Sequence, residues 1–304
     1  MYLRLKRHFK RSFIAITALL AIAVLVVYLL SQRRLLRDYE VSVSLAPPRA
    51  QLAAEGAQLA RSRGCADCHG DDFGGKVVLD EVPFARVMGT NLTHAPGTSD
   101  PAREHERFYR ALHHGVDLQS RPLLLMPSAE FAHLSAHEIE ALSAYLAGLP
   151  YVRRTLPLSA MGPLGRALLV GGKLQGFLSA EVIDHARPAI AAAPPLGTVA
   201  YGEHAAQLCT GCHRSDFGGG PMSHGGPNAP PAANLTPHDS GLAAWSEADF
   251  VAAMRTGKRP DGSDIDGAFM PWRAVGQASD QELHSIWLYL RSRPAIARAT
   301  RTVQ

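Results

Sequence analysis

Two short runs hold all four cysteines of this 304-residue chain, and each run reads Cys-x-x-Cys-His. This pattern is the attachment signature of a c-type haem, because two thiols can form thioethers to the haem vinyl groups. The adjacent histidine can then bind the iron from one side. We therefore predict two covalently bound haem c groups, attached through Cys65 and Cys68 with His69 as an iron ligand, and through Cys209 and Cys212 with His213.

Two other uses of such runs are a zinc site and a redox-active thiol pair. Paired zinc knuckles place their Cys-x-x-Cys runs roughly 15–20 residues apart, whereas Cys209 lies 141 residues after Cys68. A thioredoxin-like pair needs a βαβ context, which the sequence does not suggest. Neither use explains why a histidine follows both runs, so haem attachment is the preferred interpretation.

The second half of the chain repeats the first at a nearly constant offset, which indicates two related domains. Residues separated by 144 positions include Cys65 and Cys209, Phe73 and Phe217, Met126 and Met270, Ser135 and Ser279, and Tyr145 and Tyr289. We predict a first domain over 47–150, a linker over 151–196 that packs on one or both domains, and a second domain over 197–304.

Each copy reads as mostly helical. Its last helix has the clearest start, because Ser135 and Ser279 both begin an S-x-x-E capping box. Apolar residues then recur at helical spacing in both copies. We predict an all-α fold and no strand.

Met126 and Met270 are the candidates for the second axial ligand of each iron. Each lies 57 residues after the histidine of its own run, and each precedes a proline. A single methionine more often simply fills space in a core. The equal His–Met separations, through loops of otherwise unequal length, instead favour the same structural role for both methionines. Methionine opposite histidine raises the reduction potential and suits electron transfer.

Other residues compete less well for the iron. Met88 and Met222 lack a counterpart in the other copy. The remaining histidines are more simply explained as solvated or hydrogen-bonded side chains; those considered are His113, His114, His133, His137 and His224.

The N-terminal region predicts a membrane anchor. Residues 13–30 form an uncharged, mostly apolar stretch, with five Lys or Arg before it and three Arg soon after it. This bias favours a cytoplasmic N-terminus and an exported remainder. A cleaved signal peptide is the alternative, but Arg33 and Arg34 stand where small residues would mark a cleavage site. Residues 1–46 are thus predicted to form a basic tip, a transmembrane anchor and a tether.

The charge balance changes sign behind that anchor. The chain has 31 cations and 27 anions, and eight of the cations precede Asp38. Removing those eight leaves 23 cations against 27 anions, so residues 38–304 carry a net charge of −4. The basic pI therefore reflects the anchor, and nucleic-acid binding loses its electrostatic support.

These motifs together resemble bacterial class I c-type cytochromes, particularly the cytochrome subunits of membrane-bound periplasmic dehydrogenases for alcohols, gluconate and aldehydes. The resemblance rests on Cys-x-x-Cys-His, Phe-Gly-Gly, Asn-Leu-Thr, Met-Pro and the terminal Tyr-Leu helix, and it covers nearly all of 50–150 and 197–294. It implies two tandem all-α haem domains, with His69 and Met126 as one axial pair and His213 and Met270 as the other. Those subunits commonly carry three haems, whereas this chain has two attachment runs.

The predicted function is a membrane-anchored dihaem cytochrome c that relays electrons in the periplasm. It would connect a donor, such as a dehydrogenase, to a cytochrome or oxidase acceptor, and would not itself be an enzyme. The alternative is a dihaem redox enzyme, such as a peroxidase, with one open iron site. A haem sensor is disfavoured, because no kinase-like, nucleotide-binding or DNA-binding segment accompanies the haem runs.

Overall fold

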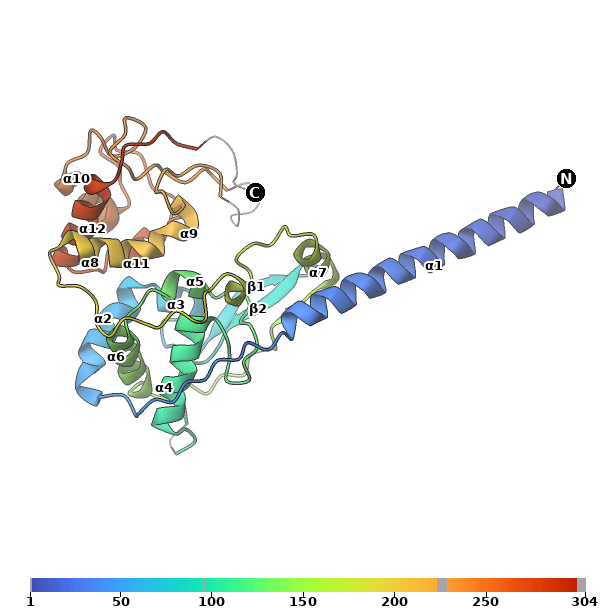
Figure 1. Ribbon diagram of the computed structural model, residues 1–304, viewed down its shortest axis with the longest axis horizontal. Coiled ribbons are helices and arrows are strands. Elements are labelled where there is room, and N and C mark those ends of the chain that lie inside the picture. The colour runs from blue at the N-terminus through green and yellow to red at the C-terminus, as the bar shows by residue number, and fades with distance from the viewer. Residues whose placement is uncertain (1, 96, 223–228, 300–304) are drawn as a thin grey trace.

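The computed structural model describes residues 2–95, 97–222 and 229–299, and it has two helical domains and one projecting helix (Figure 1). The projecting helix is α1 (Tyr2–Leu35), which extends away from both domains. It is the one helix among the described residues that is long and apolar enough to cross a membrane. By length and composition it fits the predicted anchor.

The first domain surrounds the first haem run. Its helices are η1 (Ala50–Leu52), α2 (Ala53–Ser62), α3 (Cys65–His69), α4 (Pro101–Tyr109), the π-helical turn η2 (Arg110–His114), α5 (Ser128–Phe131) and α6 (Ala136–Ala147). The connecting region 151–196 adds α7 (Pro163–Val170) and η3 (Ser179–Glu181).

The second domain surrounds the second haem run, and its regular elements among the described residues are all helices. Its elements are α8 (Val199–Ala206), η4 (Gln207–Cys209), α9 (Thr210–His213), α10 (Glu247–Thr256), α11 (Trp272–Val275) and α12 (Asp280–Ser292). The predicted start of the last helix is found in each domain: the Ser135 and Ser279 hydroxyls accept hydrogen bonds from the backbone N–H groups of Glu138 and Glu282. In the first domain the Glu138 carboxylate also accepts from the backbone N–H of Ser135, which completes the predicted capping box.

The first and last helices of each domain cross at a glycine. A Cβ added at Gly56 of α2 would lie 1.9 Å from the carbonyl oxygen of Ala141 in α6. A Cβ added at Gly202 of α8 would lie 1.9 Å from the carbonyl oxygen of Ser285 in α12. In both domains the backbones therefore approach too closely for any side chain.

The prediction of no strand was wrong for the first domain. Strand β1 (Lys76–Glu81) pairs antiparallel with β2 (Ala85–Gly89), and the short β3 (Ala160–Met161) pairs with the other edge of β2. The hairpin forms because β-branched residues begin β1 and a turn containing Pro83 joins the strands. The core facing α7 includes Val87 and Leu169. The fold remains mostly helical, as expected.

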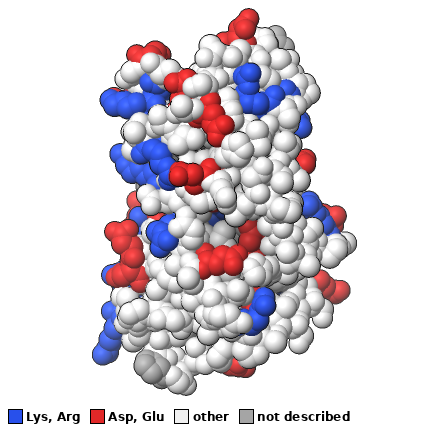
Figure 2. Space-filling model, turned by 90° about the vertical axis from the view of Figure 1, so that its left-hand side faces the viewer, with Lys and Arg blue, Asp and Glu red and all other residues white. Residues whose placement is uncertain are grey.

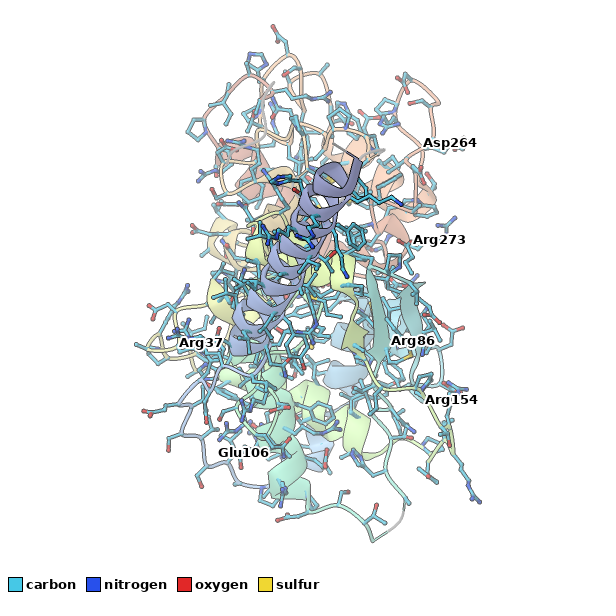
Figure 3. The ribbon with its side chains drawn as sticks, turned by 90° about the vertical axis from the view of Figure 1, so that its right-hand side faces the viewer. Arg37, Arg86, Glu106, Arg154, Asp264 and Arg273 are labelled. Atoms are coloured by element: carbon cyan, nitrogen blue, oxygen red, sulfur yellow. The ribbon has the colours of Figure 1, made fainter. Side chains whose placement is uncertain are left out.

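The anchor helix is attached by several contacts to the connecting region 151–196, which itself packs on β2 of the first domain. Arg34 forms an ion pair with Glu181 at 2.5 Å and donates a hydrogen bond to the carbonyl oxygen of Leu169. Arg166 of α7 donates to the hydroxyl of Ser31 at 2.9 Å. Figure 3 looks toward the domains from the α1 side, with Arg37 beside the end of α1.

The segment after α1 also follows the surface of the first domain. The backbone N–H of Tyr39 donates to the carbonyl oxygen of Ser120, and the ring of His105 donates to the carbonyl oxygen of Ala46. The expected tether is thus held against the domain over much of its length.

The face shown in Figure 2 mixes acidic and basic side chains, so the net negative charge is not gathered there in one patch.

Candidate haem sites

The histidines of both Cys-x-x-Cys-His runs are oriented by a backbone hydrogen bond of the same kind. The Nδ1 of His69 donates to the carbonyl oxygen of Thr90 at 2.9 Å, and the Nδ1 of His213 donates to that of Ala233 at 2.8 Å. With the proton on Nδ1, the Nε2 lone pair remains available in each ring. Such a bond sets both the tautomer and the ring orientation of a metal-binding histidine.

Burial lowers the pKa of His69 and of His213, which favours the neutral imidazole that binds iron. The four cysteines form no disulfide. Burial raises the pKa of the Cys65 thiol to about 12 and that of Cys209 to about 11. A redox-active thiol pair needs the opposite shift. The donor set of each run therefore fits thioether attachment and one nitrogen ligand, as in a haem c site.

The Asn-Leu-Thr motif holds the loop that carries the histidine's hydrogen-bond acceptor. In the second domain, the side chain of Asn234 accepts hydrogen bonds from the backbone and hydroxyl of Thr236 and donates to the carbonyl oxygen of Ile296 at 2.7 Å. In the first, Asn91 accepts the same two bonds from its threonine and donates to Val152 at 2.8 Å. Each loop is thus tied to the chain that follows the last helix.

The Phe-Gly-Gly motif closes the other side of each run. Phe73 and Phe217 have a positive φ and pack edge-on against Tyr145 and Tyr289, at centroid distances of 5.8 and 5.6 Å. The backbone N–H of Gly75 donates a hydrogen bond to the carbonyl oxygen of His69, and that of Gly219 donates to the carbonyl oxygen of His213. The motif therefore positions the backbone of the histidine in each run.

The two predicted methionine ligands occupy matching backbone positions. Met126 and Met270 each precede a proline with φ near −78° or −76° and ψ of 54° or 51°. Their carbonyl oxygens accept hydrogen bonds from Ser128 at 2.8 Å and Trp272 at 2.7 Å. Each methionine packs against the apolar core that also contacts the first cysteine of its own run, Cys65 or Cys209. Each methionine therefore shares an apolar core with the run that the spacing linked it to.

The competing residues have other surroundings. Met88 is a buried residue of β2. His113 donates to the carbonyl oxygen of Arg187, and His114 lies 3.2 Å from His185. His137 bonds Glu55 at 3.0 Å. His133 borders a small pocket with His113, and Met222 is partly buried. His224 lies outside the described residues.

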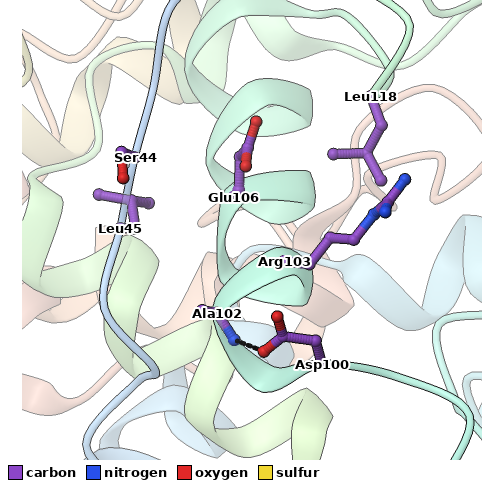
Figure 4. Close-up of a pocket in the computed structure, with 7 residues that line it drawn as sticks. All are labelled: Ser44, Leu45, Asp100, Ala102, Arg103, Glu106 and Leu118. Carbon is purple, nitrogen blue, oxygen red and sulfur yellow. Dashed lines mark hydrogen bonds between the residues drawn. The ribbon is translucent and has the colours of Figure 1, made fainter.

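A surface pocket of about 330 Å³ among the described residues lies elsewhere (Figure 4). It is lined by the segment after α1 and by α4, where Asp100 accepts a hydrogen bond from the N–H of Ala102 at 3.0 Å. Its lining contains neither haem-run nor Met-Pro residues. It is a groove left where the extended segment crosses the helix, and it contributes nothing to the haem sites.

Comparisons with known proteins identify both domains. Residues 51–146 match the family model described as cytochrome c oxidase, cbb3-type, subunit III, and residues 199–294 match the cytochrome c model. The chain is 28% identical over 292 residues to the cytochrome c subunit of the quinone-dependent alcohol dehydrogenase of Gluconobacter oxydans, a match covering 84% of the chain and 59% of that protein. A 135-residue match to a nicotinate dehydrogenase subunit of Pseudomonas putida is 30% identical and covers 42% of the chain and 11% of that protein.

The chain thus spans less than two thirds of the length of either relative. The matched ranges nevertheless contain both Cys-x-x-Cys-His runs and both Met-Pro pairs. From these matches and the two equivalent sites, we conclude that the chain belongs to the cytochrome c family and is a dihaem cytochrome c, with one haem c group covalently bound in each domain.

Proposed function

We propose that this protein is a periplasmic electron relay, anchored in the bacterial inner membrane, that carries electrons from a dehydrogenase to a cytochrome or an oxidase. The observation that carries the proposal is the equivalent arrangement in both domains of a hydrogen-bonded histidine and a Met-Pro turn, whose methionine packs on the core that also contacts the first cysteine of the run. When bound, each haem takes up and releases one electron at its iron. The residues of the chain hold that iron between two protein ligands and exclude a substrate from it.

The proposed axial pairs are His69 with Met126 and His213 with Met270. The ring hydrogen bond to Thr90 or Ala233 keeps each imidazole facing the same direction in both oxidation states. Met126 and Met270 would each supply a neutral sulfur ligand to the iron, which would favour the ferrous state.

The proposed location rests on α1. Its apolar length fits one membrane crossing. The contacts of Arg34 with Glu181 and of Arg166 with Ser31 lie at the end of α1 next to the domains. If the apolar part of α1 spans the bilayer, these contacts hold the first domain close to the membrane surface. The proposed domain limits are 47–150 and 197–304, with 151–196 as the connection between them.

The proposed donor is a dehydrogenase, because both relatives named above are parts of dehydrogenases. We infer that this chain contributes electron transfer to such a complex, while another polypeptide carries out the chemistry. Copurification from the native membrane identifies the donor. Recovery of the chain with no dehydrogenase component would argue against this partner.

Optical spectroscopy of the oxidised holoprotein tests the axial ligands. Met126→Ala and Met270→Ala should each remove about half of the methionine–iron charge-transfer band and lower the potential of one haem only. Met88→Leu is the matched control, because a volume-conserving change at a buried methionine outside the sites should leave both bands intact. A variant that keeps the full band would show that its methionine is not a ligand. A high-spin, five-coordinate haem in the unmodified protein would instead favour a peroxidase-like enzyme.

A further inference from the structure

The two domains meet through the segments that carry the haem runs. Helix α5, which follows Met126, contacts η4, and Leu208 of η4 packs against the apolar core of the first domain. In the reciprocal direction, α11 contacts α2, where Gln58 donates a hydrogen bond to the carbonyl oxygen of Gln277. The attachment segment of each haem is therefore part of the contact between the domains.

A buried arginine joins the two domains at this contact. Arg63 lies two residues before Cys65, and its side chain is 4% exposed. Its Nη1 is 2.6 Å from a carboxylate oxygen of Glu282 in the second domain, and its Nη2 is 3.9 Å from one of Glu138 in the first. One guanidinium thus pairs with the last helices of both domains.

The two carboxylates are equivalent residues of the repeat. Glu138 and Glu282 both occupy the third position of the last helix, and both side chains are about as buried as Arg63. His204 of α8 adds a second link between the domains, because its Nε2 is 2.8 Å from the other oxygen of Glu138. The cluster therefore consists of Arg63, Glu138, Glu282 and His204.

Such a cluster is a costly way to join two domains. Burying charges carries a large desolvation penalty, and apolar residues of similar volume often join surfaces equally well. The Nε and Nη2 atoms of Arg63 moreover have no hydrogen-bond partner among the described residues. The charge itself is thus the feature that an apolar contact would lack.

The field of this charge reaches both haem attachment points. Arg63 lies two residues before Cys65, and its positive charge interacts electrostatically with the positions of both Cys65 and Cys209. The second domain has no such cation of its own at the matching position, because the residue two positions before Cys209 is Gln207. A single side chain therefore acts electrostatically on both runs.

We propose that Arg63 is a positioning residue shared by the two haems, which holds the attachment segments together and raises the reduction potential of both. This inference rests on the proposed electron relay and deepens it. A buried positive charge stabilises the ferrous state of a nearby iron relative to the ferric state, because the ferric state carries one more positive charge. Because both haems lie near the same charge, a change in that charge should shift both reduction potentials in the same direction.

Arg63→Gln tests the charge by introducing the residue that the second domain already has at this position. Both potentials should fall, with the ferrous-to-ferric ratio of each haem changing at least tenfold, which is about 59 mV for one electron. Arg63→Lys should keep both potentials close to the original values. Arg61→Gln is the matched control, because Arg61 is an exposed residue of α2 that lies two positions before Arg63 and bonds Gln58.

Glu282→Gln separates an electrostatic role from a structural one. Removal of this buried negative charge should raise both potentials, opposite in sign to Arg63→Gln. A merely structural contact predicts the same direction for both variants, because opening the interface admits water to the haems and favours the ferric state. Since Gln matches Glu in shape, this arm also remains informative if Arg63→Gln folds poorly.

Spectroelectrochemical titration of the full-length holoprotein in detergent resolves the two potentials. Shifts of equal sign in both variants, a shift confined to one haem, or no shift with either variant would each overturn the inference. The methionine–iron band of the unmodified protein is recorded in the same titration. Its absence would contradict the proposed ligation, whereas an intact band with unmoved potentials would contradict only the role of Arg63.

Discussion

The two haem domains share the contacts around the haem run and differ in nearly everything placed outside them. Both have the backbone acceptor for the histidine, the Asn-Leu-Thr loop, the Phe-Gly-Gly turn, the Met-Pro turn and the helix crossing at a glycine. Only the first, among the described residues, adds a β-sheet, α7 and the end of α1. The shared set is what haem attachment requires, and the additions serve the connection to the anchor.

The largest expected effect concerns the two helix crossings, which have equivalent geometry in the two domains. Gly56→Ala and Gly202→Ala each place a Cβ 1.9 Å from a carbonyl oxygen of the last helix. Because backbone must move in both cases, each change should lower the free energy of unfolding by about 3 kcal/mol. Chemical denaturation of the holoprotein, followed at the haem absorbance, measures the loss.

Gly148→Ala is the control for that pair. A Cβ there would be 3.5 Å from its nearest neighbour atom, the carbonyl oxygen of Tyr145, which is an ordinary contact. The free energy of unfolding of this variant should stay within about 0.5 kcal/mol of that of the unmodified protein. Clearly unequal losses for Gly56→Ala and Gly202→Ala would show that the two crossings are not equivalent.

A smaller effect should distinguish the two Asn-Leu-Thr loops. The side chain of Asn234 is almost fully buried and donates to both Ile296 and Ser240, whereas Asn91 is partly buried and donates to Val152. Asn234→Ala should therefore cost about 2 kcal/mol and Asn91→Ala about 1 kcal/mol, since the more buried partners stay unsatisfied. Equal costs, measured by the same denaturation, would mean that burial does not separate the loops.

The sequence was sufficient to predict the parts that repeat. The haem runs, the capped last helices and the Met-Pro turns are local patterns, and each pattern occurs twice, so each copy supports the interpretation of the other. The hairpin β1–β2 was missed because it occurs once and its strands are short. Val77 and Val78 before a proline-containing turn were the available signal.

The charge cluster between the domains could not be predicted in the same way. Arg63 follows a short helix and reads as a solvated cation, because nothing in the local pattern indicates its burial. Its ion pair with Glu282 joins residues 219 positions apart. Such a contact depends on how the domains pack together, which periodicity and capping rules do not describe.

The smallest expected effect concerns the cluster formed by His113, His114 and His185, which has no counterpart at the matching position of the second domain. In both domains the helix before the methionine loop ends at a glycine with positive φ, Gly115 or Gly257. The residue before that glycine is His114 in the first domain and the exposed Thr256 in the second. Burial, together with His113, His185 and Arg110, lowers the pKa of His114 to about 4.

The direction of the pH effect follows from that pKa. Between pH 6.5 and 4 the unfolded chain binds a proton at His114 that the folded protein does not, so stability is full above 6.5 and falls as the pH drops. At about pH 5.5 the loss of stability should be about 1 kcal/mol.

His114→Asn, which keeps a donor toward His185, should remove this loss when denaturation is compared at about pH 7.5 and about pH 5.5. Thr256→Asn, its counterpart in the second domain, should leave the pH dependence unchanged. If His114→Asn retained the full loss, His114 would not be the cause of this pH dependence.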